Sequence, residues 1–131
     1  MTSPTRLIMS TSALLLGIMG MAATFAPREI LGSLGVAPMV ITQLMVQILG
    51  ALYLGFASMN WMMRDGIIGG IYNRPVVIGN LTHFLVAAMA MLRVVTDSPS
   101  GRSLWPVAVV YAGYTLAFGV LLFRHPVKDA P

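Results

Sequence analysis

Long apolar runs alternate with short polar segments along this chain. Four runs stand out, and they cover residues 7–26, 38–63, 75–95 and 104–124. Each reaches about 20 residues, the length that an α-helix needs to cross the hydrocarbon layer of a bilayer. The second and third runs, joined by a polar turn, predict a central hairpin. The whole pattern predicts an all-α integral membrane protein, an antiparallel four-helix bundle that forms one membrane domain over residues 1–131.

The first apolar run has two interpretations. Arg6 precedes the run and small residues end it, which is the layout of a secretory signal peptide. The run is longer than the apolar part of a typical signal peptide, and Pro27 stands where a mature chain would begin. We therefore expect a retained first span.

The segment of residues 27–38 is too short to cross a bilayer. We expect one or two helical turns at the membrane interface there, and a re-entrant ligand loop is the less favoured alternative. Pro38 and Pro75 are expected in the first turns of the second and third spans, because a missing N–H costs nothing at that position.

Small and polar residues form a stripe along each predicted span. At about 100° per residue, each set falls on one helix face. Such residues allow close helix contacts and interhelical hydrogen bonds in a membrane, and they bring no advantage toward lipid. We therefore expect the stripes to face the interior of the bundle. They are Ser10, Ala13, Gly17 and Thr24; Gln43, Gln47, Gly50 and Ala57; Gly79, Asn80, His83, Ala87 and Ala90; and Ala108, Ala112, Thr115 and Gly119.

Composition agrees with a membrane location and excludes several kinds of chemistry. Of the 131 residues, 57% are hydrophobic and 9% are charged, which is too little charge to cover a soluble domain. The chain has no cysteine, so disulfides, thiol nucleophiles, iron–sulfur clusters and cysteine-bound zinc are excluded. The 11 methionines are scattered over the spans, which favours adaptable packing over a copper site.

The net charge of +4 comes from residues at the ends of the apolar runs. This placement is typical of helix anchoring, whereas nucleic-acid binding needs basic residues clustered on one face. Five basic residues accompany the termini and the 64–74 turn, and three lie on the opposite side. The positive-inside rule then predicts that both termini are cytoplasmic. The five are Arg6, Arg64, Arg74, Arg124 and Lys128, and the three are Arg28, Arg93 and Arg102.

His83 is the histidine that lies within a predicted span, on the same face as Asn80. An imidazole in hydrocarbon is costly without a partner, so it is expected to point into the bundle. Tyr111 and Tyr114 lie within about one helical turn of its depth and are the expected partners. His83 is then either a neutral, hydrogen-bonded core residue or a group that binds a ligand or handles a proton.

Gln43 and Gln47 lie one turn apart on the second span. They either line a polar pocket that opens toward the non-cytoplasmic side or join helices by hydrogen bonds, which is the commoner role of such amides. The expected ligand-binding residues, which we call the six candidate residues, are Gln43, Gln47, Asn80, His83, Tyr111 and Tyr114.

Several functional classes lose support from the sequence. The acidic residues all lie at the edges of the spans, whereas proton-coupled pumps usually place a carboxylate at mid-membrane. His125 lies beyond the fourth span, so a bis-histidine haem is not expected. The sequence also lacks a Gly-rich phosphate loop and an HExxH motif. We expect no cofactor, no metal and no catalytic residue.

Three segments resemble small bacterial four-helix membrane proteins of the DoxX-like type and neighbouring families of unknown function. The segments are FAPREILGSLGV, ILGALYLGFASMNWMMRDG and RPVVIGNLTHFLVAAMAM. They share a proline and a short interfacial turn after the first span, a Gly-x-x-x-x-Gly in the second and a basic turn before the third. The resemblance implies a protein of the bacterial inner membrane, and some relatives are described as parts of quinone-using oxidoreductase systems. We transfer no functional residue, because this sequence has neither a redox-active cysteine nor a clear cofactor ligand.

Three functions remain as hypotheses. The first is a binding or accessory protein that holds a lipid-like or quinone-like molecule between helices, near Gln47, His83 and the two tyrosines, as a homo-oligomer or within a larger membrane complex. The second is an oligomeric transporter or channel lined by Gln43, Gln47 and Asn80. The third is a membrane enzyme acting on a lipid, with His83 as acid or base, and it ranks last because the sequence offers only tyrosines and amides beside it. The expected partners are thus the bilayer, such a small molecule and other protein chains, and nucleic acid is not among them.

Overall fold

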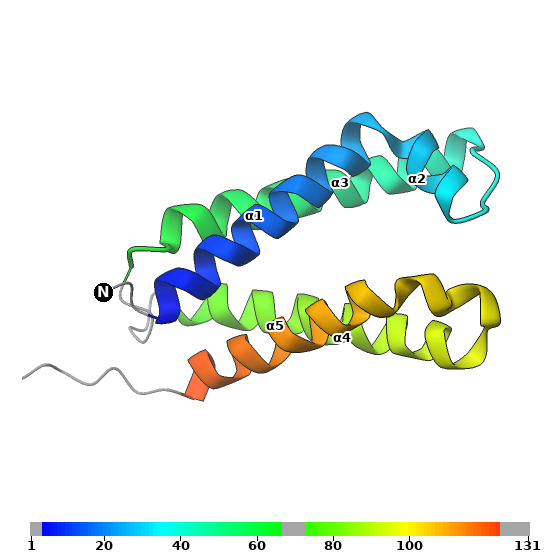
Figure 1. The fold of residues 1–131 in the computed structure, drawn as a ribbon. Coiled ribbons are helices and arrows are strands. Elements are labelled where there is room, and N and C mark those ends of the chain that lie inside the picture. The colour runs from blue at the N-terminus through cyan, green and yellow to red at the C-terminus, as the bar shows by residue number, and fades with distance from the viewer. Residues whose placement is uncertain (1–3, 67–72, 124–131) are drawn as a thin grey trace, which may run out of the picture. The chain divides into compact units, whose positions relative to one another are not determined.

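The computed structural model describes residues 4–66 and 73–123, and this part of the chain is helical with no strand. Four of its helices are long and apolar enough to cross a membrane. The predicted fold class, an all-α integral membrane protein with four spans, is confirmed. The elements are α1 (Pro4–Phe25), α2 (Pro27–Ser33), α3 (Val40–Met63), α4 (Arg74–Asp97), the 3-10 helix η1 (Pro99–Leu104) and α5 (Trp105–Phe123) (Figure 1).

The chain forms two compact units, which divide between residues 64 and 65. Hairpin 1 contains α1, α2 and α3, with α1 and α3 packed antiparallel. Hairpin 2 contains α4, η1 and α5, with α4 and α5 packed antiparallel. Within the described residues, large apolar side chains remain widely exposed, as at Val40 with 85% and Met62 with 80%. A soluble domain would hide many of these side chains, whereas the lipid of a bilayer accommodates them.

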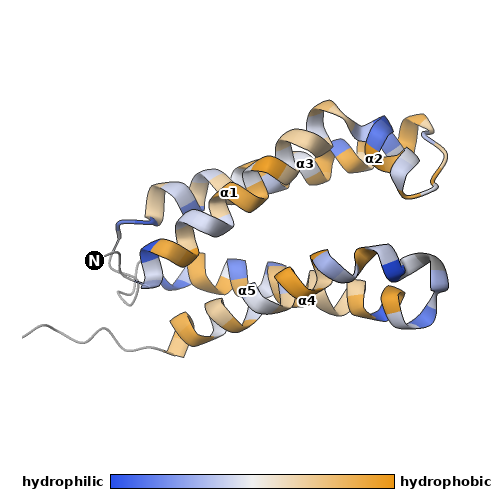
Figure 2. Ribbon diagram, viewed as in Figure 1, coloured by the Kyte–Doolittle hydropathy of each residue, from blue (hydrophilic) through white to orange (hydrophobic). Residues whose placement is uncertain are grey.

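Hydrophobic residues run along all four long helices, and hydrophilic residues lie at helix ends and turns and at a few positions within the helices (Figure 2). This distribution follows the rule that charged side chains are costly in hydrocarbon. The short α2, predicted as one or two interfacial turns, is a helix of 7 residues that begins at Pro27.

Two predictions about the segments between the spans differ from the structure. Pro38 does not lie in the first turn of the second span, since α3 begins at Val40 after the extended Met39. The Pro38 carbonyl instead accepts a hydrogen bond of 2.6 Å from Gln43 Nε2. Residues 96–103, the polar segment between the third and fourth predicted spans, continue α4 through Asp97 and then form η1.

The two glycines Gly20 and Gly50 bring α1 and α3 into backbone contact in hairpin 1. A Cβ on Gly20 would lie 3.0 Å from the Gly50 carbonyl oxygen, and a Cβ on Gly50 would lie 2.9 Å from the Thr24 nitrogen. Small residues are what allow such an approach between membrane helices. Gly50 belongs to the predicted stripe, whereas Gly20 does not.

A buried hydrogen bond also joins α1 to α3. Asn60 Nδ2 donates to Ser12 Oγ over 3.1 Å, and both side chains are fully buried. The Ser12 hydroxyl in turn donates to the Met9 carbonyl over 3.0 Å. This pair lies outside the predicted stripes, and it fixes the register of the two helices.

Candidate functional site

The six candidate residues are shared between the two hairpins. Gln43 and Gln47 lie on α3 of hairpin 1, and the other four lie on α4 and α5 of hairpin 2.

Gln43 connects α3 to the segment that precedes it. Its Oε1 accepts a hydrogen bond of 3.0 Å from Arg28 Nε on α2, while its Nε2 donates to the Pro38 carbonyl. Gln47 reaches the end of α1, where its Nε2 donates to the Thr24 carbonyl over 3.4 Å. Both amides therefore join parts of hairpin 1, which favours the interpretation of these residues as helix-joining groups.

Asn80 lies inside hairpin 2 and is fully buried. Its Nδ2 donates to the Val76 carbonyl, one turn earlier on α4, over 2.9 Å. A buried amide needs such partners, because an unsatisfied polar group in an apolar region carries a desolvation penalty. This bond joins the Asn80 amide to the preceding turn of its own helix.

His83 packs against aromatic rings from both helices of hairpin 2. Its ring centroid lies 5.1 Å from that of Phe84 and 5.8 Å from that of Tyr111 on α5. The expected neighbour Tyr111 is thus brought beside His83. Tyr114 instead stacks on Phe84, with a centroid distance of 4.9 Å and an interplanar angle of 22°.

Phe84 is the centre of this aromatic cluster, which comprises His83, Phe84, Tyr111, Tyr114 and Phe118. It is fully buried and meets the rings of Tyr111 at 5.0 Å and Phe118 at 5.7 Å. Sequence reasoning missed both phenylalanines as site neighbours. The usable signal was the spacing of Tyr111, Tyr114 and Phe118, which places three rings on one face of α5.

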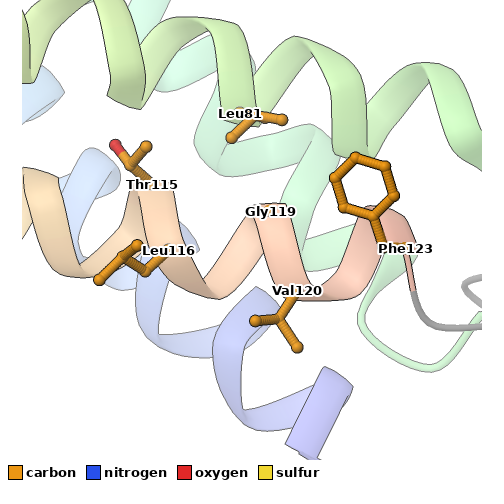
Figure 3. A pocket seen from close by; sticks show the side chains of 6 residues that line it. All are labelled: Leu81, Thr115, Leu116, Gly119, Val120 and Phe123. Carbon is orange, nitrogen blue, oxygen red and sulfur yellow. The ribbon is translucent and has the colours of Figure 1, made fainter.

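Beside the cluster, α4 and α5 form an apolar groove of about 620 Å³ (Figure 3). The groove is hollow at Gly119 because glycine has no side chain. A Cβ there would meet only Leu81, at 3.9 Å. The Thr115 hydroxyl donates to the Tyr111 carbonyl over 2.9 Å, so its hydrogen bond is made within the helix. We call this the α4–α5 groove, and its lining residues are Leu81, Thr115, Leu116, Gly119, Val120 and Phe123.

The groove includes Thr115 and Gly119 of the predicted fourth stripe and none of the six candidate residues. Among the described residues, no group of three or more His, Cys, Asp and Glu side chains is arranged to hold a metal ion. His125 and the basic residues Arg124 and Lys128 lie outside the described part of the chain.

Comparisons with protein families, with curated proteins and with solved structures find no match to this chain. The DoxX-like resemblance therefore stays a prediction.

Proposed function

We propose that this chain is a small integral membrane protein of binding or accessory type that holds a lipid-like or quinone-like molecule. The α4–α5 groove carries the proposal. Its volume of about 620 Å³ falls within the usual range of small-molecule sites, about 300–1,000 Å³. Its walls are aliphatic and aromatic side chains, with the internally bonded Thr115 as the polar exception. Such a surface favours a hydrocarbon chain over a polar solute.

The shape of the groove matches an extended chain. Its α5 residues lie at positions 115, 116, 119, 120 and 123, which form one stripe along the helix. From Thr115 to Phe123 the stripe rises by about 12 Å. One end lies within one turn of Tyr111 and the aromatic cluster, and the other lies at the end of α5. An isoprenoid or acyl chain would lie along this stripe, with its ring or headgroup at one end.

A matched pair of substitutions on α5 tests the proposal. Gly119→Leu would fill the groove, whereas Gly113→Leu places the same side chain where a Cβ meets nothing within 4 Å. The measurement is native mass spectrometry of protein purified in mild detergent, followed by organic extraction to identify any retained molecule.

The parent protein and Gly113→Leu should carry a stoichiometric small-molecule adduct. The fraction of Gly119→Leu that carries this adduct should be at least about tenfold lower, which corresponds to a loss of about 1.4 kcal/mol in binding free energy. An ultraviolet absorption band typical of quinones in the extract would distinguish a quinone from a lipid. A parent protein without any adduct, or equal adducts in both variants, would contradict the proposal.

The proposal also includes location in a bacterial inner membrane with cytoplasmic termini and a DoxX-like relationship. Arg6 and Arg64 lie at one end of hairpin 1, and Arg28 lies at the other. In hairpin 2, Arg74 begins α4, and Arg102 lies at the opposite end in η1. This division supports the orientation through the positive-inside rule. The proposed accessory role also includes docking on a larger membrane complex or self-association.

The channel alternative gains no specific support from these contacts. Its proposed lining residues Gln43, Gln47 and Asn80 make hydrogen bonds to neighbouring backbone within their own hairpins. The lipid-enzyme alternative depends on His83, which packs against the rings of Phe84 and Tyr111.

A further inference from the structure

Hairpin 1 carries a second groove, between α1 and α3, of about 320 Å³. Its lining includes the small residues Ala13 and Ala57, which are buried, together with the exposed Ser58. The large residues Leu14 of α1 and Trp61 of α3, both exposed, complete the lining. The Ser58 hydroxyl donates to the Leu54 carbonyl over 2.9 Å, so it presents no unsatisfied donor to the groove. This α1–α3 groove is therefore a mostly apolar surface hollow with a large side chain from each helix in its lining.

An arginine is held against the tryptophan wall of this groove. The guanidinium carbon of Arg64 lies 4.1 Å from the centroid of the Trp61 ring, in a cation–π contact. Its Nη1 also donates to the Trp61 carbonyl over 2.7 Å. These two contacts hold the guanidinium against Trp61, which lines the groove.

The end of hairpin 1 that contains Trp61 and Arg64 has the charge and the aromatic character of a membrane interface. Within residues 4–64, the charged groups at the end of hairpin 1 that contains Arg64 are Arg6 and Arg64, with Asp65 next along the chain, so positive charge prevails. Tryptophan is enriched where hydrocarbon meets the headgroups, because its ring is apolar and its N–H is polar. The α1–α3 groove thus has Arg64 in contact with its residue Trp61 near the end of hairpin 1, and Ala57 lies one turn deeper along α3.

We infer that the α1–α3 groove binds one acyl chain of an anionic phospholipid, with the lipid phosphate at Arg64. From Arg64 to Ala57, α3 descends about 10 Å, enough for the upper part of an acyl chain to lie in the groove. The planar guanidinium matches phosphate oxygens in a paired geometry. A zwitterionic lipid would bring its own cation toward Arg6 and Arg64, so the site favours a net negative headgroup. This inference goes beyond the proposed function, which concerns hairpin 2.

The chain contains 2 tryptophans, which allows Trp61 to report its own lipid neighbours. In a Trp105→Phe background, Trp61 is the single tryptophan. The protein is reconstituted in vesicles that contain brominated phosphatidylglycerol or brominated phosphatidylcholine at equal mole fraction, and quenching is measured relative to the same lipids without bromine. We expect a relative binding constant about fivefold higher for phosphatidylglycerol, the value for one arginine at a membrane surface.

Two pairs of variants distinguish a specific lipid-binding site from a general effect of surface charge. Arg64→Gln should bring the ratio close to one, whereas Arg28→Gln, which removes the same charge at the opposite end of hairpin 1, should preserve it. Ser58→Leu fills the groove and should lower the ratio. Gly55→Leu adds the same side chain on α3 where a Cβ meets nothing within 4 Å, and it should leave the ratio unchanged.

Three outcomes would overturn the inference. The first is a ratio close to one in the Trp105→Phe background. The second is a ratio that persists in both Arg64→Gln and Ser58→Leu, since diffuse charge would then explain it. The third is competition by millimolar inorganic phosphate, which would identify a phosphate site rather than a lipid site. Circular dichroism of each variant verifies its helical content.

Discussion

Single glycines decide how closely the helices of hairpin 1 approach. At Gly50 a Cβ would lie 2.6 Å from Thr24 Oγ1 and 3.0 Å from the Gly20 carbonyl oxygen. The second neighbour is backbone and cannot rotate away, so any side chain there must push the helices apart. Gly55, five residues later on the same helix, has nothing within 4 Å of its Cβ position.

We predict that Gly50→Ala lowers the free energy of unfolding by about 1–3 kcal/mol, the usual cost of overpacking. Gly55→Ala is the matched control, and it should be neutral or stabilise by up to about 1 kcal/mol, since alanine is the better helix former. Unfolding of the detergent-solubilised protein, followed by circular dichroism, measures both. Equal stability of the two variants would show that the backbones do not touch at Gly50.

The residue contacts of hairpin 1 were only partly predictable. Gly17, Gly50 and Ala57 belong to the predicted stripes, and a Cβ on Gly17 would lie 3.7 Å from that of Ala57. The partly exposed Ser10 was assigned to the interface, whereas the fully buried Ser12 was not. Small residues occupy several adjacent positions there, so periodicity alone does not select the buried face. The register with Asn60 on α3 selects it.

At the scale of elements, ring packing joins the two long helices of hairpin 2. Phe84 supplies one aromatic ring from α4. The rings that pack against it from α5 are those of Tyr111, Tyr114 and Phe118. Lipid is as apolar as these side chains, so burial alone gives little reason for the helices to associate. Their association therefore depends on ring geometry and close packing.

We predict that Phe84→Ala destabilises hairpin 2 by at least about 1.5 kcal/mol, because it removes several aromatic pairs that each contribute about 0.5–1.5 kcal/mol. Leu85→Ala, at an exposed neighbouring position, should change stability by less than about 0.5 kcal/mol. The same unfolding measurement applies, with the fluorescence of Trp105 in a Trp61→Phe background as a probe of hairpin 2. If the two variants unfold alike, the aromatic cluster does not hold α4 to α5.

The elements themselves could be predicted because a bilayer imposes their length. The predicted spans 38–63 and 75–95 correspond to α3 at Val40–Met63 and α4 at Arg74–Asp97. The remaining differences arise at turns, where Pro38 accepts a side-chain bond and residues 99–104 wind into η1. Hydropathy carries no information about such local bonds.

At the scale of the whole molecule, the orientation in the membrane is open to a direct test. The chain has no cysteine, so each introduced cysteine is a unique label site. We predict that a membrane-impermeant maleimide added to intact bacterial cells labels Ser33→Cys and Ser103→Cys and leaves Asp65→Cys unlabelled. The reason is the excess of basic residues on the side of Asp65.

Permeabilised cells provide the control, since all three cysteines should then react. Labelling of Asp65→Cys alone in intact cells would reverse the orientation. Labelling of all three in intact cells would contradict the arrangement of spans.

The candidate site was less predictable than the fold. Helical depth placed Tyr111 beside His83, because depth follows from counting residues along two spans. The α4–α5 groove was not foreseen, because it results from an absent side chain at Gly119 opposite Leu81. Such a hollow depends on the register between two helices, and the hydrophobic pattern of each helix does not show that register.

The closest contacts of hairpin 1 have a consequence for biosynthesis. Gly20, Gly50, Ser12 and Asn60 all lie before residue 65, so every partner in these contacts has been translated before α4 begins. A ribosome adding about 5–20 residues per second then needs at least about 3 s to complete the chain. During that interval the first hairpin can leave the translocon as a packed pair, with its buried amide already satisfied.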